Sequence, residues 1–247
     1  MEHLAGKRLL LTRAEGDNGP WIERLRSLDS EAVPFPCIVI EPLELSPGWE
    51  AHLEDSHWVA FTSHRSVLRF ASLLEGRTLA AHQIAAVGPT TRAACMDCFG
   101  RCDLTASSGS ALSLASALTP KLVPDAGVLL PGAADPRPEL ASALRDAGAR
   151  PIPLPLYATR PASTAGERAT FTREDIDAVL FASPSAVSGA FATASLPLDL
   201  PTACLGPTTA AAARAAGLTC VATSKTRDLD GLLTALKEHL TPNPQTR

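Results

Sequence analysis

The chain has 247 residues, of which 45% are hydrophobic and 19% are charged, and its formal net charge is −4. This composition is typical of a globular protein and excludes a disordered chain, and the lack of a basic excess argues against a nucleic-acid binder. No apolar run reaches the roughly 18 residues that a membrane-spanning helix needs, and the first residues lack the basic-then-apolar order of a signal peptide. We therefore expect a cytoplasmic protein that binds neither nucleic acid nor a membrane. We also expect a monomer.

The first half of the chain alternates short apolar runs with helical patterns. An apolar run at residues 9–11 is followed by apolar side chains at helical spacing over residues 21–28. Residues 33–40 form an extended, proline-punctuated stretch. Apolar runs at residues 58–61 and 84–87 predict buried strands, and each is followed by a helix start.

The second half shows the same alternation. Apolar runs at residues 128–130, 179–181 and 203–205 predict strands. Helical patterns cover residues 140–144, and a last helix is expected over residues 232–240. Because strands alternate with helices, we expect doubly wound parallel sheets of the α/β class.

The two halves repeat each other. Val59-Ala-Phe-Thr-Ser63 is echoed by Val179-Leu-Phe-Ala-Ser183 at an offset of 120 residues, and Val87-Gly-Pro-Thr-Thr91 is echoed by Leu205-Gly-Pro-Thr-Thr209 at an offset of 118. A near-constant offset with the motifs in the same order is hard to obtain by chance. We infer two α/β units related by internal duplication.

Polar loops follow the expected strands. In open parallel sheets, ligands bind beyond the carboxyl ends of the strands, and a helix start there offers free N–H groups and a positive dipole end to an anion. Ser and Thr at such starts can instead serve only as N-caps, but the repeated Gly-Pro-Thr-Thr favours a site, and two facing sets of loops would form an anion-binding cleft. The candidate substrate-binding residues are Thr12, Arg13, Thr62, Ser63, Arg65, Gly88, Thr90, Thr91, Arg137, Ser183, Ser185, Gly206, Thr208 and Thr209.

Other sequence signatures argue against several common kinds of site. The chain has no phosphate-binding Gly-rich loop, no Gly-x-Ser-x-Gly motif and no His-Glu-x-x-His motif. The cluster formed by Cys95, Cys98 and Cys102 lacks a fourth ligand at a zinc-like spacing, which favours free thiols beside a helix over a metal site. Tyr157, the only tyrosine, follows a proline-rich stretch. It is either a packed residue with a wet hydroxyl group or a proton donor in a site.

Six motifs, in this order and at this spacing, resemble the pattern of the uroporphyrinogen-III synthase family. They are Leu9-Leu-Leu-Thr-Arg13, Phe61-Thr-Ser-His-Arg-Ser-Val67, Ala86-Val-Gly-Pro-Thr90, Leu156-Tyr-Ala-Thr159, Phe181-Ala-Ser-Pro-Ser185 and Leu205-Gly-Pro-Thr-Thr209. The resemblance implies two α/β domains joined by two extended connectors, with the middle of the chain inserted into the domain built by its ends. We therefore expect one domain from residues 1–36 and 160–247, an inserted domain from residues 37–159, and connectors near 34–42 and 151–161.

The resemblance also implies a reaction. Such an enzyme cyclises hydroxymethylbilane, a linear tetrapyrrole with eight carboxylates, into uroporphyrinogen III, and it needs no metal or other cofactor. Tyr157 matches the proton donor to the leaving hydroxyl, and Arg137 is expected to supply charge where many members carry an arginine in place of Pro131. A transient contact with the hydroxymethylbilane synthase is also expected. The alternative function is a non-catalytic two-domain protein that binds or senses an anionic small molecule.

Overall fold

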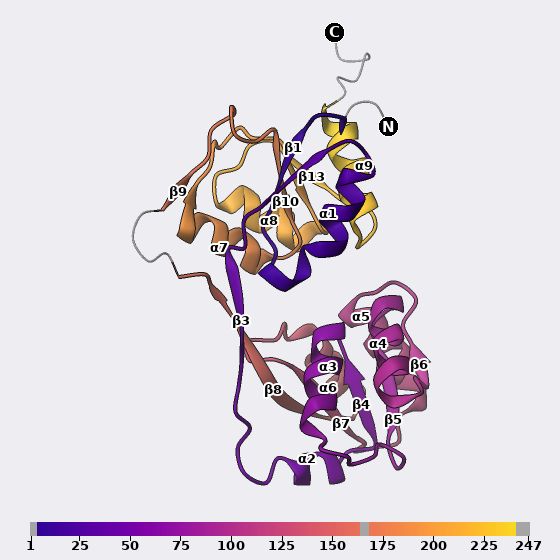
Figure 1. Ribbon diagram of the computed structural model, residues 1–247. Coiled ribbons are helices and arrows are strands. Elements are labelled where there is room, and N and C mark those ends of the chain that lie inside the picture. The colour runs from indigo at the N-terminus through magenta and orange to yellow at the C-terminus, as the bar shows by residue number, and fades with distance from the viewer. Residues whose placement is uncertain (1–3, 164–167, 241–247) are drawn as a thin grey trace. The chain divides into compact units, whose positions relative to one another are not determined.

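The computed structural model describes residues 4–163 and 168–240 (Figure 1). The chain divides into two compact units, a first unit of Met1–Ile40 with Thr159–Arg247 and a second unit of Glu41–Ala158. Residues 37–40, which we expected in the inserted domain, belong to the first unit because Cys37 and Ile38 pack in its core.

The first unit is built on a parallel sheet of five strands in the order β13-β12-β10-β1-β2. β1 lies between β10 and β2, and Leu10 is in register with Val179 on one side and Val33 on the other. The elements of this unit are β1 (Arg8–Leu11), a 3-10 turn (Glu15–Asp17), α1 (Gly19–Arg26), β2 (Glu31–Pro34), β9 (Ala169–Thr170), β10 (Ala178–Phe181), α7 (Pro184–Thr193), β11 (Ala194–Ser195), β12 (Thr202–Cys204), α8 (Pro207–Ala215), β13 (Val221–Thr223) and α9 (Leu229–Leu240). β9 and β11 form a separate two-stranded sheet.

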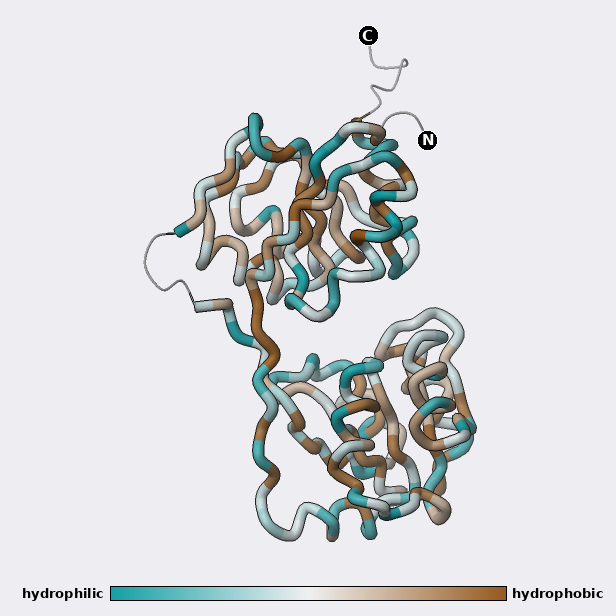
Figure 2. The backbone as a smooth tube through the Cα atoms, viewed as in Figure 1, coloured by the Kyte–Doolittle hydropathy of each residue, from teal (hydrophilic) through white to brown (hydrophobic). Residues whose placement is uncertain are grey.

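The central strands β1, β10 and β12 of the first unit are buried on both faces, as a sheet covered on both sides requires. Leu10 and Val179 pack in one core cluster with residues of α7 and α8. The neighbouring Leu9 and Leu11 pack in another cluster with residues of α1 and α9. Because successive side chains of a strand point to opposite faces, the short apolar runs fill both layers, and Figure 2 shows the resulting hydrophobic centre of the unit.

The second unit is built on a six-stranded sheet in the order β3-β8-β7-β4-β5-β6. β4 is parallel to both β5 and β7, and β7 is parallel to β8. The elements of this unit are α2 (Glu50–Glu54), β4 (Trp58–Phe61), α3 (His64–Leu73), β5 (Gln83–Ala86), α4 (Pro89–Phe99), β6 (Leu104–Thr105), α5 (Ala111–Leu118), a 3-10 turn (Thr119–Lys121), β7 (Gly127–Ala133), α6 (Glu139–Asp146) and β8 (Arg150–Pro161), with β3 (Ile38–Pro42) entering from the first unit.

Helices cover both faces of this sheet as well. Trp58 and Val128 pack in one core cluster with residues of α5 and α6. On the opposite face, Phe61 of β4 contacts Phe70 of α3 and Phe99 of α4, with ring centroids 5.7 and 5.8 Å apart. The doubly wound α/β class expected from the sequence is therefore confirmed in both units, whereas their origin by duplication stays a prediction.

The proline-rich stretch expected as a connector is mostly a strand of the second unit. β8 pairs with β7 over its whole first half, with Val128 opposite Pro151 and Leu130 opposite Pro153. The N–H group of Arg150 donates a hydrogen bond to Ala126 O, on the side of β7. Because successive backbone nitrogens of a strand point to opposite sides, the nitrogens of the prolines that follow at alternate positions point away from β7. β3 reaches only the later part of β8, where Leu43 N donates to Leu156 O. The prolines therefore occupy an edge where no N–H donor is needed.

Several elements were not expected from the sequence, among them α2, α5, β6 and β13. β6 contains only two residues, too few for a periodic signal, and α5 follows the serine-rich stretch 107–110. Ser110 caps α5 by accepting a hydrogen bond from Ser113 N at 3.1 Å. The α4 helix begins at Pro89, because proline fits the first helical turn. Among the described residues, no helix is long and apolar enough to span a bilayer.

Candidate functional site

The strand order reverses once in each sheet. In the first unit the chain leaves β1 toward β2 and later fills the positions from β10 to β13 on the other side. In the second unit the same reversal separates β4 from β7. In sheets of this kind ligands bind beyond the carboxyl ends of the strands at the reversal. These ends carry Thr12 and Ser183 in the first unit and Ser63 in the second.

Tyr157 lies near the carboxyl end of β4, where the strand order of the second unit reverses. Its own strand, β8, is not adjacent to β4 in the sheet. Its phenol oxygen lies 3.3 Å from Ser63 Oγ. β7 lies between β4 and β8, but it pairs with β4 only as far as Leu129 and with β8 as far as Ala133. A bulge between Gly132 and Ala133 shifts the register with β8. Because β7 leaves β4 early, Tyr157 can reach the loop that follows β4.

Arg65 completes this cluster. Its guanidinium carbon lies 5.6 Å from the centroid of the Tyr157 ring, within the range of a cation–π contact. Arg65 is in the first turn of α3, which starts directly after Ser63. Ser63, Arg65 and Tyr157, hereafter the Tyr157 cluster, thus place a phenol, a hydroxyl and a positive charge together at one helix start.

Ser63 is also a structural residue. Its Oγ accepts a hydrogen bond from Ser66 N at 3.1 Å, and the buried Ser66 donates from Oγ to Ser63 O at 2.7 Å. Ser66 was not among the residues selected from the sequence. Its place three residues after an N-cap, inside the quoted Phe61–Val67 motif, is the signal that identifies it as the residue that holds Ser63 in position.

Ser183 occupies the equivalent place in the first unit. Its side chain accepts from Ala186 N at 3.2 Å, and its Oγ lies 2.9 Å from Ser185 Oγ. Both serines have extended backbone and cap α7 and α3 in the same way. The capping that the sequence predicted therefore occurs. The 2.9 Å contact also means that the hydroxyl groups of Ser183 and Ser185 share one hydrogen bond.

The Gly-Pro-Thr-Thr starts of α4 and α8 differ from these serine caps. Gly88 and Gly206 are the N-caps, and neither helix has a side-chain cap. Gly206 has φ 85, a left-handed conformation that favours glycine. Thr90 and Thr208 are exposed at these starts. Each of these starts therefore places a helix amino end, whose backbone N–H groups and dipole favour an anion, beside the carboxyl end of a strand.

Three of the predicted threonines are buried and serve the fold. Thr12 is fully buried, and its hydroxyl donates to Leu180 O of β10 at 2.8 Å. Thr209 donates to Leu205 O at 3.2 Å, and Thr91 is 5% exposed. In contrast, Thr62 and Arg137 are exposed. Some of the predicted site residues are therefore accessible to a ligand, whereas others are buried within their own unit.

Arg13 follows Thr12 and is held by its own unit. Its guanidinium lies 4.4 Å from the ring centroid of Trp21 and 3.8 Å from Asp17 Oδ2. Its side chain is 19% exposed. The carboxyl ends of β1 and β4 each therefore carry one arginine that rests on an aromatic ring, Arg13 in the first unit and Arg65 in the second.

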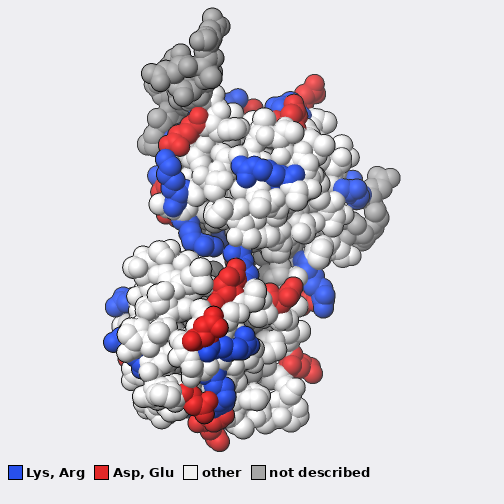
Figure 3. All heavy atoms as spheres, turned by 180° about the vertical axis from the view of Figure 1, so that it is seen from behind, with Lys and Arg blue, Asp and Glu red and all other residues white. Residues whose placement is uncertain are grey.

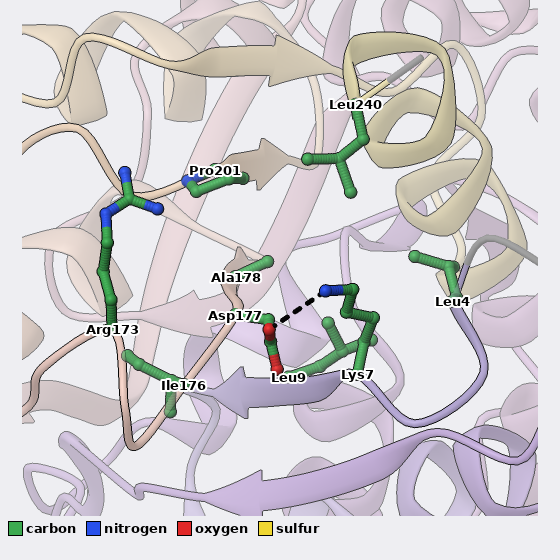
Figure 4. A pocket seen from close by; sticks show the side chains of 9 residues that line it. All are labelled: Leu4, Lys7, Leu9, Arg173, Ile176, Asp177, Ala178, Pro201 and Leu240. Carbon is green, nitrogen blue, oxygen red and sulfur yellow. Dashed lines mark hydrogen bonds and ion pairs between the residues drawn. The ribbon is translucent and has the colours of Figure 1, made fainter.

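A pocket of about 180 Å³ lies at the amino ends of β1, β10 and β12 in the first unit, opposite the carboxyl ends that carry the predicted site residues (Figure 4). Lys7 and Asp177 form a 3.2 Å ion pair in it, and Leu4 and Leu240 close one side. Because Lys7 is paired with Asp177, Arg173 is paired with Asp199, and the pocket faces away from the carboxyl ends, it does not belong to the predicted site.

Charged side chains are mixed in sign on the face of the molecule drawn in Figure 3. Basic and acidic side chains are interspersed there, with uncharged surface between them. Among the described residues, no group of three or more His, Cys, Asp or Glu side chains is placed to hold a metal ion. The anion-binding features identified in the described part of the chain are thus helix starts and single arginines.

Comparison with solved structures supports the fold. A mutant uroporphyrinogen III synthase from Thermus thermophilus matches 95% of this chain and 99% of its own, with a TM-score of 0.59 and 20% identity. Uroporphyrinogen-III synthetase from Helicobacter pylori 26695 matches 94% of this chain and 99% of its own, with a TM-score of 0.64 and 15% identity. At these identities the likeness is one of fold alone.

Comparison of sequences identifies the family as well as the fold. The porphyrin biosynthesis protein HemD of Ruminiclostridium josui is 27% identical over 248 residues, which covers 95% of this chain and 49% of that protein. The chain therefore spans about half the length of this curated relative. The family model of uroporphyrinogen-III synthase HemD matches residues 19–234, well over half of the chain. The chain belongs to the uroporphyrinogen-III synthase family.

Proposed function

We propose that this chain converts hydroxymethylbilane into uroporphyrinogen III, a step of tetrapyrrole biosynthesis in which ring D is inverted and water is released. The observation that carries this proposal is the family match over residues 19–234, which includes both Gly-Pro-Thr-Thr helix starts and the Tyr157 cluster. The alternative, a protein that only binds an anionic small molecule, has no observation in its favour beyond the same helix starts.

The carboxylates of the substrate bind to helix starts in this proposal. α4 and α8 begin at the glycine N-caps Gly88 and Gly206, and helix amino ends of this kind bind acetate and propionate groups through backbone N–H groups. The exposed Thr90 and Thr208 add hydroxyl donors at the same places. Arg65 and Arg137 supply positive charge in the second unit. A substrate with eight carboxylates suits such a distributed set of weak donors.

Tyr157 is proposed to donate a proton to the leaving hydroxyl of the substrate. When that hydroxyl departs as water, the remaining azafulvene is electrophilic and Tyr157 carries a negative charge. Ser63 Oγ, 3.3 Å from the phenol oxygen, can donate a hydrogen bond to that oxygen. The Arg65 guanidinium over the ring stabilises the same negative charge electrostatically. The Tyr157 cluster thus contains the groups that an acid of this kind needs.

The remaining chemistry depends on conformation. Attack by the substituted carbon of the last ring gives a spiro intermediate, which fragments and recombines with the ring inverted. The substrate closes to the uninverted isomer without an enzyme, so the protein has to hold the chain in the geometry of the productive closure. Binding of several carboxylates at fixed helix starts is the means proposed here.

An isomer assay tests the function. Hydroxymethylbilane is generated from porphobilinogen by its deaminase, this protein is added, and the oxidised products are separated into uroporphyrin I and III. We expect uroporphyrin III in proportion to the protein, with heat-denatured protein as the control. Uroporphyrin I alone, from protein with an intact circular dichroism spectrum, would replace the proposal by the binding-protein alternative. The cytoplasmic location, the monomeric state and the contact with the hydroxymethylbilane synthase remain predictions.

A further inference from the structure

Three hydroxyl groups lie in a row at the start of α3. Ser66 Oγ lies 3.1 Å from Ser63 Oγ, and Ser63 Oγ lies 3.3 Å from the phenol oxygen of Tyr157. In the contact between Ser63 and Tyr157, either oxygen could be the donor. The direction of this hydrogen bond decides where the proton of the proposed acid points.

The other hydrogen bonds of the two serines determine that direction. Ser66 Oγ donates to Ser63 O at 2.7 Å, and a hydroxyl group has only one proton to donate. Ser66 Oγ can therefore only accept from Ser63 Oγ, which donates to it at 3.1 Å. Ser63 Oγ thereby uses its own proton, and it also accepts from Ser66 N. Its remaining lone pair is available to Tyr157, so the phenol is the donor in their contact.

Ser66 acts on Tyr157 only through Ser63. The side chain of Ser66 is fully buried, so its hydroxyl group is closed to solvent and to a substrate. The helix cap does not need this hydroxyl group, because the equivalent position at the start of α7 holds Ala186, and Ser183 still accepts from Ala186 N at 3.2 Å. The Ser66 hydroxyl is therefore an addition to the cap in the unit where Tyr157 lies beside the capping serine.

We propose that Ser66 is a positioning residue for the acid Tyr157, an inference that rests on the proposed function. By holding the proton of Ser63, Ser66 directs the Tyr157 proton toward Ser63 in the substrate-free protein. In the reaction, that proton passes from Tyr157 Oη to the leaving hydroxyl, the C–O bond of the substrate breaks, and its electron pair leaves with the water. The phenolate can only accept, so the Ser63 proton turns from Ser66 Oγ to Tyr157 Oη.

This change of partner gives Ser66→Ala an effect opposite to that of structural damage. The hydrogen bond from Ser63 to Ser66 exists before proton transfer and is lost when Ser63 turns to the phenolate. Without the Ser66 hydroxyl, Ser63 can donate to Tyr157 throughout, and no hydrogen bond is lost. We expect Ser66→Ala to raise kcat/KM in the isomer assay by about 2- to 10-fold, the net value of one hydrogen bond. An unchanged or lower kcat/KM overturns the proposal.

Ser72→Ala is the matched control, because the exposed Ser72 also donates to the carbonyl oxygen three residues before it. It should leave kcat/KM at the value of the parent chain. An equal rise of kcat/KM in Ser72→Ala would overturn the proposal, since Ser72 donates to Arg69 O and makes no hydrogen bond to Ser63 or Tyr157.

Nuclear magnetic resonance tests the direction of the hydrogen bond without substrate. Tyr157 is the only tyrosine, so protein labelled with carbon-13 at the tyrosine Cζ gives one such resonance. A phenol that donates its proton gains electron density on oxygen, which shifts Cζ downfield toward its phenolate position. We expect the resonance to move upfield in Ser66→Ala, where the phenol oxygen accepts from Ser63, and to stay in place in Ser72→Ala.

The two readouts keep the proposal separate from the proposed function. An unmoved Cζ resonance in folded Ser66→Ala overturns the proposal, whatever the activity. An upfield shift in a chain without synthase activity refutes the proposed function but confirms the direction of the hydrogen bond.

Two further measurements apply if Ser66→Ala does not fold. Ser66→Thr keeps a hydroxyl group at the same place and should leave the Cζ resonance at its parent position. Neutron diffraction from a deuterium-exchanged crystal of the parent chain locates the deuterons directly. We expect the Tyr157 deuteron to point at Ser63 Oγ and the Ser63 deuteron to point at Ser66 Oγ. A Ser63 deuteron directed at Tyr157 overturns the proposal without any variant.

Discussion

The hydroxyl oxygen of Tyr157 lies 3.3 Å from Ser63 Oγ, although the two residues are 94 positions apart in the chain. Ser63 is at the same time the N-cap of α3, and Arg65 in that helix covers the tyrosine ring. One helix start therefore positions the hydroxyl, the positive charge and the proposed acid together. Substitutions of Tyr157 and Ser63 should separate the chemical role of this contact from its structural role.

Removal of the phenol hydroxyl should affect turnover more than substrate binding. We expect Tyr157→Phe to lower kcat by about 10²–10⁴-fold, the usual contribution of a positioned general acid, with KM changed much less. The isomer assay at several substrate concentrations measures both constants. Ser72→Ala, which removes an exposed hydroxyl from the same unit, is the control and should behave like the parent chain. Unchanged turnover in Tyr157→Phe would end its assignment as the acid.

Ser63→Ala should lower both stability and activity, because Ser63 caps α3 and contacts Tyr157. The loss of the cap should cost about 1 kcal/mol of unfolding free energy. Ser56→Ala removes a buried hydroxyl that donates to Leu53 O just before the amino end of β4, and should cost a similar amount. Urea unfolding of both variants, combined with the isomer assay, checks the prediction. An equal loss of activity in the two variants would mean that Ser63 acts through stability alone.

Asp177 should make the first unit sensitive to acid. Burial raises the pKa of Asp177, but hydrogen bonds from Arg8 N at 2.8 Å and from Lys7 outweigh burial and hold the pKa below its usual value. A lowered pKa adds stability above the unfolded-state value of about 3.9, and that stability is lost as the pH falls through the folded-state value.

Asp177→Asn should therefore destabilise the protein by about 1.5–3 kcal/mol at pH 7, the usual contribution of hydrogen bonds to a charged group, and by much less below pH of about 3. Urea unfolding at both pH values measures the difference. Asp230→Asn, which breaks only the exposed pair with Arg24, should change stability by less than about 1 kcal/mol. A penalty for Asp177→Asn that does not depend on pH would contradict the pKa argument.

Gly189 should not tolerate a side chain. A Cβ atom there would lie 2.4 Å from Cys37 O and 2.7 Å from Ile38 Cγ2, because α7 packs directly against the chain segment before β3. Gly189→Ala should cost about 1–3 kcal/mol through overpacking. Gly19→Ala is the control, since nothing lies within 4 Å of a Cβ at that first position of α1. Thermal unfolding compares the two variants, and equal melting temperatures would disprove the close approach.

Local patterns were enough to identify most helices and strands. Apolar runs of about four residues were strands because a sheet covered on both faces buries every side chain of the strand, as at β4 and β10. Ser63 and Ser183 were identifiable as N-caps because a cap depends on residues within one turn. β6 was too short to carry such a pattern.

The site could be predicted only in part, because a sequence pattern describes neighbours along the chain and not neighbours in space. The sequence placed polar residues at helix starts, but it could not distinguish the enclosed Thr12 and Thr209 from the exposed Thr90 and Thr208. That distinction depends on which strand lies next to the threonine, as when Thr12 donates to Leu180 O of β10. Burial is a property of neighbours that are distant in the chain.

The sequence by itself determined the alternation of strands and helices, the two Gly-Pro-Thr-Thr helix starts and the family, because these depend on residues close together in the chain or on motifs in a fixed order. The tertiary structure decided that β7 leaves β4 at Leu129 and lets Tyr157 reach Ser63. This contact follows from strand register, which no local pattern specifies.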